Sequence, residues 1–185
     1  MWFLPRTVGS APIRSEPGSF VQAFARRIES GLLPRASTRR SRYSVVRRGP
    51  DGLAFRAMDW LTAVNVGLNE VELSASAGRA RYQIAYRRYA AYVVLLSAAI
   101  ALVMAVVFLT LDVHDYVERH PGGTIPGLTA GQNVAVGWSM LFFWGFLWPW
   151  ILIGLHKRPL RMLMERIIAE VDQGARTQSA RPPSS

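Results

Sequence analysis

The sequence of 185 residues contains no cysteine, and a single lysine stands among its 22 Lys and Arg residues. Without cysteine the chain forms no disulfide, no thiolate metal site and no cysteine nucleophile. Charge is also missing locally, because the runs 90–111 and 134–155 contain no Asp, Glu, Lys or Arg. Basic residues nevertheless prevail over the 12 Asp and Glu, and the formal net charge is +10.

The two uncharged runs have the length of membrane spans. Each contains 22 residues, and a helix needs about 20 apolar residues to cross a hydrocarbon core roughly 30 Å thick. Because the connection between the runs is short, their helices should be antiparallel neighbours. The sequence therefore predicts a transmembrane hairpin over 89–156, with a loop at 112–133.

The distribution of basic residues predicts how this hairpin is oriented. Residues 1–89 contain 15 arginines, whereas the loop 112–132 contains only Arg119. Lys and Arg resist translocation, so both termini should be cytoplasmic and the loop extracytoplasmic. We expect a bacterial inner membrane; the alternative is the mitochondrial inner membrane, since the arginine-rich N-terminus resembles a transit peptide. The expected interface anchors are Arg87, Arg88, Trp148, Trp150, Lys157 and Arg158.

The first 41 residues are rich in arginine, serine and proline, a composition that buries too little apolar surface to fold. The sequence therefore predicts a flexible basic N-terminal segment over 1–41, whether or not it is a processed targeting segment. Within it Ser19 can cap a short helix that lies on the membrane surface. The apolar positions of this helix, four residues apart, are Phe20, Phe24, Ile28 and Leu32.

Residues 42–88 have the pattern of a small folded module. Two short strand-like runs, 43–47 and 53–57, flank a Gly-Pro-Asp-Gly sequence that favours a tight turn. Asp59 can cap a helix with Trp60 at the centre of its apolar face, and two further alternating runs follow. The pattern predicts a cytoplasmic α+β module of order ββαββ with Trp60 in its core.

Small residues indicate how the two apolar helices pack, because small side chains let helix backbones approach closely. The expected packing residues are Ser97, Ala101, Ala105, Gly137 and Gly145. Pro149 in the second run removes one backbone donor. We expect it to kink that helix.

Residues 157–173 show the most regular amphipathic pattern of the chain. The apolar side consists of Leu160, Leu163, Met164, Ile167, Ile168 and Val171. The polar side carries both signs of charge, which suits packing against protein better than lying on anionic lipid. We expect a cytoplasmic C-terminal helix packed on the module or on a second copy. Gly174 should end it, leaving a disordered tail at 174–185.

The loop contains the one cluster of side chains suited to chemistry: Asp112, His114, Asp115, Glu118 and His120. Its candidate metal ligands are His114, Glu118 and His120. Zinc needs at least three protein ligands, and the Pro-Gly-Gly after His120 favours a turn, so a solvated helix end is the simpler interpretation. Neither apolar run contains a His or a carboxylate that would serve a cofactor or a proton pathway. We expect no metal, no cofactor and no enzymatic activity.

Nucleic-acid binding is not expected either, because membrane orientation and anionic lipid already account for the excess arginine. The sequence thus predicts a membrane protein whose partners are the lipid bilayer and another membrane protein or a second copy of itself. The favoured function is that of a non-catalytic accessory or scaffold subunit. The alternative is a sensor that binds lipid or a small molecule, or an oligomeric transport component.

Overall fold

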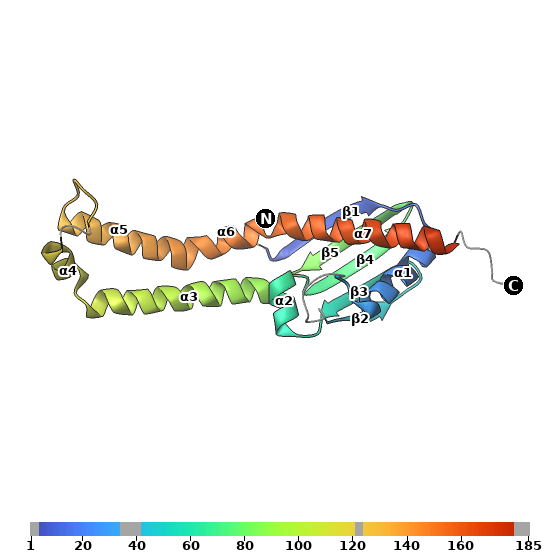
Figure 1. Cartoon of the computed structure of the whole chain (residues 1–185), viewed down its shortest axis with the longest axis horizontal. Coiled ribbons are helices and arrows are strands. Elements are labelled where there is room, and N and C mark those ends of the chain that lie inside the picture. Colours follow the sequence, from blue (N-terminus) through green and yellow to red (C-terminus); the bar gives the residue numbers. More distant parts are fainter. Residues whose placement is uncertain (1–3, 34–41, 121–123, 180–185) are drawn as a thin grey trace. The chain divides into compact units, whose positions relative to one another are not determined.

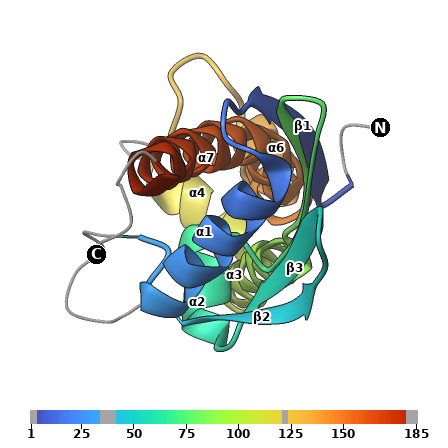
Figure 2. The same ribbon diagram turned by 90° about the vertical axis from the view of Figure 1, so that its right-hand side faces the viewer.

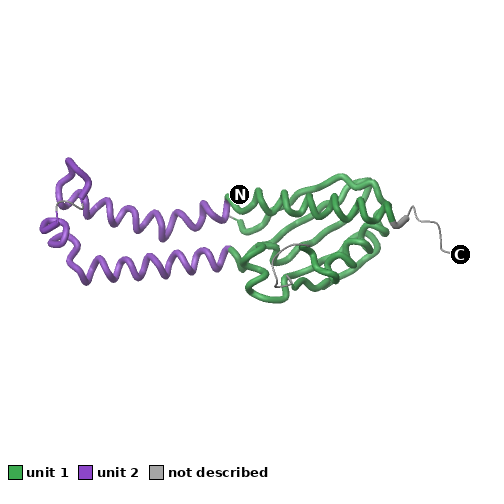
Figure 3. The backbone as a smooth tube through the Cα atoms, viewed as in Figure 1, with its two compact units in different colours: residues 1–89, 155–185 green, residues 90–154 purple. Residues whose placement is uncertain are grey.

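The computed structural model describes residues 4–33, 42–120 and 124–179. The chain contains two compact units: residues 1–89 together with 155–185 form the first unit, and residues 90–154 form the second (Figure 3). The second unit lies within the range predicted for the hairpin. The first unit is therefore discontinuous in sequence, since its last segment follows the whole of the second unit.

A five-stranded antiparallel sheet organises the first unit (Figure 1). Its strands are β1 (Arg6–Pro12), β2 (Tyr43–Arg48), β3 (Gly52–Ala57), β4 (Glu70–Ser76) and β5 (Arg79–Ala85), in the spatial order β1-β5-β4-β3-β2. Buried and exposed residues alternate along β4, as in a sheet with one packed face. With helix α2 (Trp60–Val66) between β3 and β4, the structure confirms a mixed α+β fold and the ββαββ order of residues 42–88.

The N-terminal segment is folded over residues that the structure describes, which corrects the prediction of a flexible segment at 1–41. β1 pairs with β5 along its whole length, and α1 (Pro17–Ser30) follows. Phe20 and Phe24 of α1 are fully buried, so this helix packs on the sheet and does not lie on a membrane surface. Average composition was misleading here, because the few apolar residues gather on one helix face. Residues 34–41 lie outside the described residues.

The cap of α1 is Glu16, and the prediction of Ser19 as the cap is wrong. The Glu16 carboxylate accepts bonds from the backbone amide of Ser19 at 3.0 Å and from its hydroxyl at 2.8 Å, and these bonds lower the pKa of Glu16. Pro17 fits the first helical position because its missing N–H would have no intrahelical partner there. The helix consequently begins before the predicted cap.

Helix α7 (Lys157–Ser179) completes the first unit. It contacts α1 and β1, and both helices lie on the same face of the sheet (Figure 2). The buried side chains of α7 include Leu160, Met164, Ile167, Ile168 and Val171, while Leu163 is half-buried. The helix does not end at Gly174, because Ala175 extends its buried side one turn beyond Val171. The tail predicted at 174–185 is therefore helical as far as Ser179.

Helix α2 leaves its largest side chain in the open. Its cap is Asp59, as predicted, whose carboxylate accepts a bond from the Thr62 amide at 2.7 Å. Trp60 is 49% exposed, however, so the prediction that it forms the core of the module is wrong. The core space is filled by α1 instead, where the Phe24 ring lies 6.0 Å from that of Phe55 between centroids.

Two helical stretches are long and apolar enough to cross a membrane, judged by length and composition alone. They are Arg87–Thr110 and Ala130–Thr177. The first stretch is helix α3 (Arg87–Thr110), and the second runs through α5 (Ala130–Phe142), the π-helical turn η2 (Phe143–Leu147), α6 (Trp148–Leu155) and α7. Between them in sequence is the short helix α4 (Val113–Arg119). The first stretch covers the run 90–111 except for Leu111, and the second includes the whole run 134–155.

The second stretch changes its hydrogen bonding just before Pro149. Proline has no N–H, and its ring crowds the carbonyl group four residues earlier, which belongs to Gly145. Gly145 lies inside η2, where the wider π-helical turn relieves this crowding. The kink itself stays a prediction, whereas the local irregularity is present.

Candidate functional site

Within the first unit, the buried side chain of Asn69 bonds the residues at which α3 begins. Its Oδ1 accepts hydrogen bonds from the backbone amides of Arg88 at 2.6 Å and Tyr89 at 3.3 Å. Its Nδ2 donates to the carbonyl oxygen of Ala63 in α2 at 2.6 Å. The first amides of a helix have no intrahelical partner, so Asn69 supplies the cap of α3. The sequence analysis missed this role, because nothing local to Asn69 indicates it.

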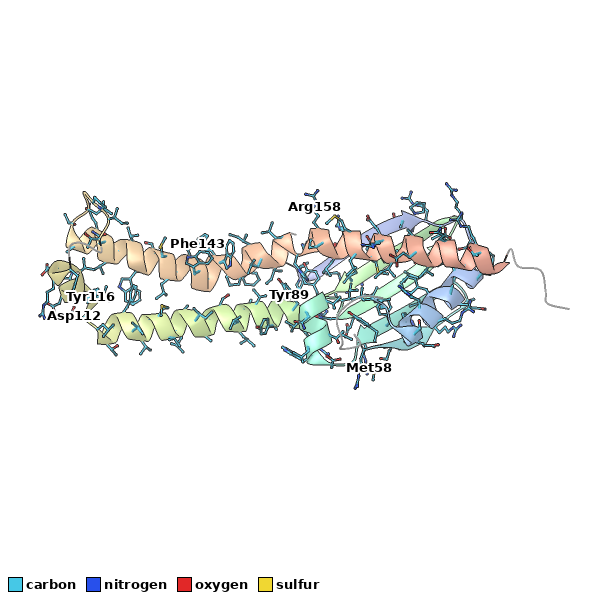
Figure 4. The ribbon with its side chains drawn as sticks, viewed as in Figure 1. Met58, Tyr89, Asp112, Tyr116, Phe143 and Arg158 are labelled. Atoms are coloured by element: carbon cyan, nitrogen blue, oxygen red, sulfur yellow. The ribbon has the colours of Figure 1, made fainter. Side chains whose placement is uncertain are left out.

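The chain returns to the first unit through an aromatic cluster around His156. The His156 ring stacks on Tyr89, at the start of α3 (Figure 4), with centroids 3.8 Å apart, and meets Tyr86 edge-on at 5.8 Å. Its buried Nε2 has no hydrogen-bond partner among the described residues and contacts Gly67. Gly67 has a φ of +81°, so this position favours glycine on two counts.

A buried carboxylate joins the C-terminal helix to the N-terminal segment. Asp172 of α7 is 5% exposed, and its Oδ1 accepts bonds from the Arg14 amide at 3.0 Å, the Ser15 amide at 2.9 Å and the Ser15 hydroxyl at 2.6 Å. Burial by itself would raise the pKa of Asp172, but these bonds and the charge of Arg176 outweigh it and lower the pKa. Asp172 therefore acts as a structural anion.

Two further polar contacts attach α7 to the sheet. The Tyr82 hydroxyl donates to Glu165 at 3.1 Å, and Arg161 Nε donates to the hydroxyl of Thr7 at 2.7 Å. Burial and the contact with Glu165 raise the pKa of Tyr82 to about 12, so the phenol stays protonated. The chain segments on either side of the second unit are thus joined by packing and by hydrogen bonds.

The sheet face opposite α1 and α7 carries a broad groove, and no described helix covers this face (Figure 2). The groove has a volume of about 960 Å³ and is lined, among others, by Ser10, Arg47, Gly52, Glu72, Ser74 and Arg81. Ser10, Arg81, Ser74 and Gly52 form one row across the neighbouring strands β1, β5, β4 and β3, and three of these four residues are small. Arg47 and Glu72 approach to 3.9 Å at its side. The groove is open to solvent and is bordered by charged side chains.

The predicted anchor residues lie around the ends of the apolar helices. Arg87 and Arg158 are exposed, and the Arg88 guanidinium donates to the Ala57 carbonyl at 3.4 Å. Lys157 is half-buried. In the second unit, Trp148 is half-buried with its ring 4.8 Å from that of Trp144, and Trp150 is exposed. The contact of these side chains with lipid stays a prediction.

The predicted packing residues of the second unit bring α3 close to the second helix at one point. A side chain at Gly145 would meet Ala101 directly, and Ser97 contributes its carbonyl oxygen at 3.9 Å. A side chain at Gly137 would lie 2.9 Å from the Phe108 ring. Ala105 is half-buried on the same helix. At Gly145 the second helix thus packs directly against the small side chain of Ala101.

The loop residues do not gather into a metal site in the part of the chain that the structure describes. His114 and Glu118 pair at 3.2 Å along α4. His120 turns toward Tyr116 instead, with its Nδ1 2.9 Å from the Tyr116 carbonyl oxygen and its ring stacked on the phenol. The three residues named from the sequence are therefore not convergent.

The geometry thus describes an α+β unit attached to two apolar helices, with structural uses for its buried polar groups. Comparison of the chain with models of known families, with curated proteins and with solved structures finds no match.

Proposed function

We propose that the chain is a two-pass protein of a bacterial inner membrane, with both termini cytoplasmic, that serves as a non-catalytic accessory or scaffold subunit. One observation supports this two-pass membrane topology. The residues before the first apolar run and those after the second fold into one unit, bonded through Asp172 to Arg14 and Ser15. Two segments of one folded unit lie on the same side of a membrane, which supports a hairpin whose two helices cross in opposite directions. The arginine-rich flanks favour the cytoplasm as that side.

The accessory role is supported by the use that the first unit makes of its polar side chains. Asn69 caps a helix, Asp172 anchors a loop, and Glu165 accepts a bond from Tyr82. Each is engaged in holding the unit together. One surface that remains available is the open sheet face, which has the breadth of a docking surface. Its occupant in this proposal is another membrane-associated subunit.

The 960 Å³ groove also favours a second candidate, in which the unit binds a small anionic molecule or a lipid headgroup. Arg81, Arg47 and Arg48 border it and exceed the neighbouring acids Asp51 and Glu72 by one charge. Guanidinium groups suit phosphate and carboxylate ligands. The two candidates differ in what accompanies the purified chain, a protein or a small molecule.

The threading is tested by cysteine labelling, for which the absence of native cysteine is an advantage. In cells with a permeable outer membrane, a maleimide that cannot cross the inner membrane should label Gly131→Cys in the loop. It should spare Ser76→Cys and Gly174→Cys, both exposed in the first unit, until the membrane is opened. Labelling of all three in intact cells, or of Ser76→Cys alone, would contradict the proposed orientation.

A further inference from the structure

Helix α2 presents apolar side chains to its surroundings although it belongs to a folded unit. Thr62 and Ala63 face inward, with 8% and 0% exposure. Trp60 and Leu61 are 49% and 56% exposed, and Val64 between them on the helical wheel is half-buried. In a helix of seven residues this is an unusual choice, because the two largest apolar groups contribute little to the core.

The position of α2 in the first unit is fixed by two contacts. The Asn69 side chain bonds both the Ala63 carbonyl of α2 and the amides of Arg88 and Tyr89, where the chain leaves the unit. Gly67, at the end of α2, contacts His156, where the chain returns to the unit. Both joints with the apolar runs are therefore next to α2. Met58, which precedes α2, is exposed as well and points away from the sheet (Figure 4).

We propose that α2 is an interfacial membrane helix, whose Trp60 and Leu61 side chains enter the cytoplasmic leaflet beside the two spans. The inference rests on the proposed membrane threading. The residues beside α2 continue directly along the chain into α3. An exposed apolar side chain of α2 is therefore close to the lipid that surrounds this span. Tryptophan prefers the boundary between headgroups and acyl chains, where its ring is apolar and its N–H finds polar partners. The occupant of this face is the lipid bilayer.

Three arginines near α2 have the sign that such a position requires, while one exposed acidic residue, Glu70, lies opposite Arg56 in the sheet. Arg56 at the end of β3, together with Arg87 and Arg88, is exposed near the same joints. Anionic headgroups of the cytoplasmic leaflet attract basic side chains at the surface. The one acidic residue of the turn, Asp59, is occupied by capping α2 through Thr62.

The test uses the full-length chain with single cysteines, each labelled with an environment-sensitive fluorophore and reconstituted in phosphatidylcholine–phosphatidylglycerol vesicles. Leu61→Cys probes α2, and its exposure makes the substitution mild. Ser76→Cys is the aqueous control, because Ser76 lies at the end of the sheet far from α3. The whole of β5 separates it from the start of α3, and a strand extends by roughly 3.3 Å per residue. Ile100→Cys in the middle of α3 is the membrane control.

Spin-labelled lipid should quench the fluorophore at 61, since an interfacial helix buries its apolar face about 5–10 Å into the headgroup and acyl boundary. Aqueous iodide should quench the fluorophore at 76 several-fold more than the one at 61. If position 100 responds to lipid but 61 responds to iodide like 76, the interfacial helix is refuted while the spans stand. A label at 61 that is shielded from both quenchers refutes it too, in favour of protein covering the face. Failure of lipid to quench position 100 refutes the threading itself.

Discussion

Replacing Asn69 with alanine is expected to destabilise the first unit by about 3 kcal/mol, because unsatisfied buried polar groups cost roughly 1–3 kcal/mol each. The change removes the acceptor for the Arg88 and Tyr89 amides and the donor to Ala63. Asn69 is 5% exposed, so water does not replace it without rearrangement. The measurement is hydrogen–deuterium exchange of the detergent-solubilised chain, with faster exchange expected in α2, β4 and the first turn of α3.

Asn65→Ala is the matched control for this prediction. Asn65 is exposed near the end of α2 and lies apart from the bonds of Asn69, so in detergent its substitution should change stability by no more than about 0.5 kcal/mol. Asn69→Asp should fall between the two, because its carboxylate still accepts from the α3 amides while the bond to Ala63 is lost. Equal exchange rates for Asn69→Ala and Asn65→Ala would mean that Asn69 does not hold the joint.

The second large effect is expected at Asp172. Asp172→Ala removes three bonds to a charged acceptor, each worth about 1.5–3 kcal/mol in favourable cases, and we expect a net loss of about 2–4 kcal/mol. Urea unfolding followed by circular dichroism measures it. Glu170→Ala is the control on the same helix, since its contacts with Arg27 and Arg166 are at the surface and contribute about 0–1 kcal/mol. Equal midpoints for both variants would contradict the role of Asp172.

The same carboxylate predicts a pH dependence. The pKa of Asp172 is lower in the folded unit than the value of about 3.9 in an unfolded chain. Its contribution is therefore complete above that value and is lost as the pH falls through the folded pKa. The stability difference between the natural chain and Asp172→Asn should be constant near neutral pH and should narrow in acid. A difference that grows as the pH falls would contradict this assignment.

Much of the fold is predictable because its signals are local. The uncharged runs, the alternation along β4 and β5, and the apolar side of α7 each appear within one continuous segment. α7 was extended too little, because Gly174 is a common helix terminator, whereas here it lies on the exposed side and Ala175 continues the buried one. The burial of a later residue outweighed the local tendency of glycine.

The remaining part depends on contacts between distant residues. Asp172 bonds Arg14, which lies 158 positions earlier in the sequence. Strand β1 pairs with β5, although the segment 13–78 separates them in the sequence. No pattern in the N-terminal segment indicates that its strand completes the sheet. The same cause explains why Trp60 is exposed. Its helical spacing is that of a core residue, but α1 and α7 occupy the packed face of the sheet. Whether an apolar residue is buried therefore depends on which other elements pack on the sheet.

The most direct test of an accessory role is native mass spectrometry of the chain extracted gently from its own membrane. The measured mass reports protein partners, copy number and retained small molecules together. We expect a complex of fixed stoichiometry with at least one other membrane-associated protein. A chain that is recovered alone or only with copies of itself would contradict the accessory role, and a retained anionic molecule in that case would favour the sensor.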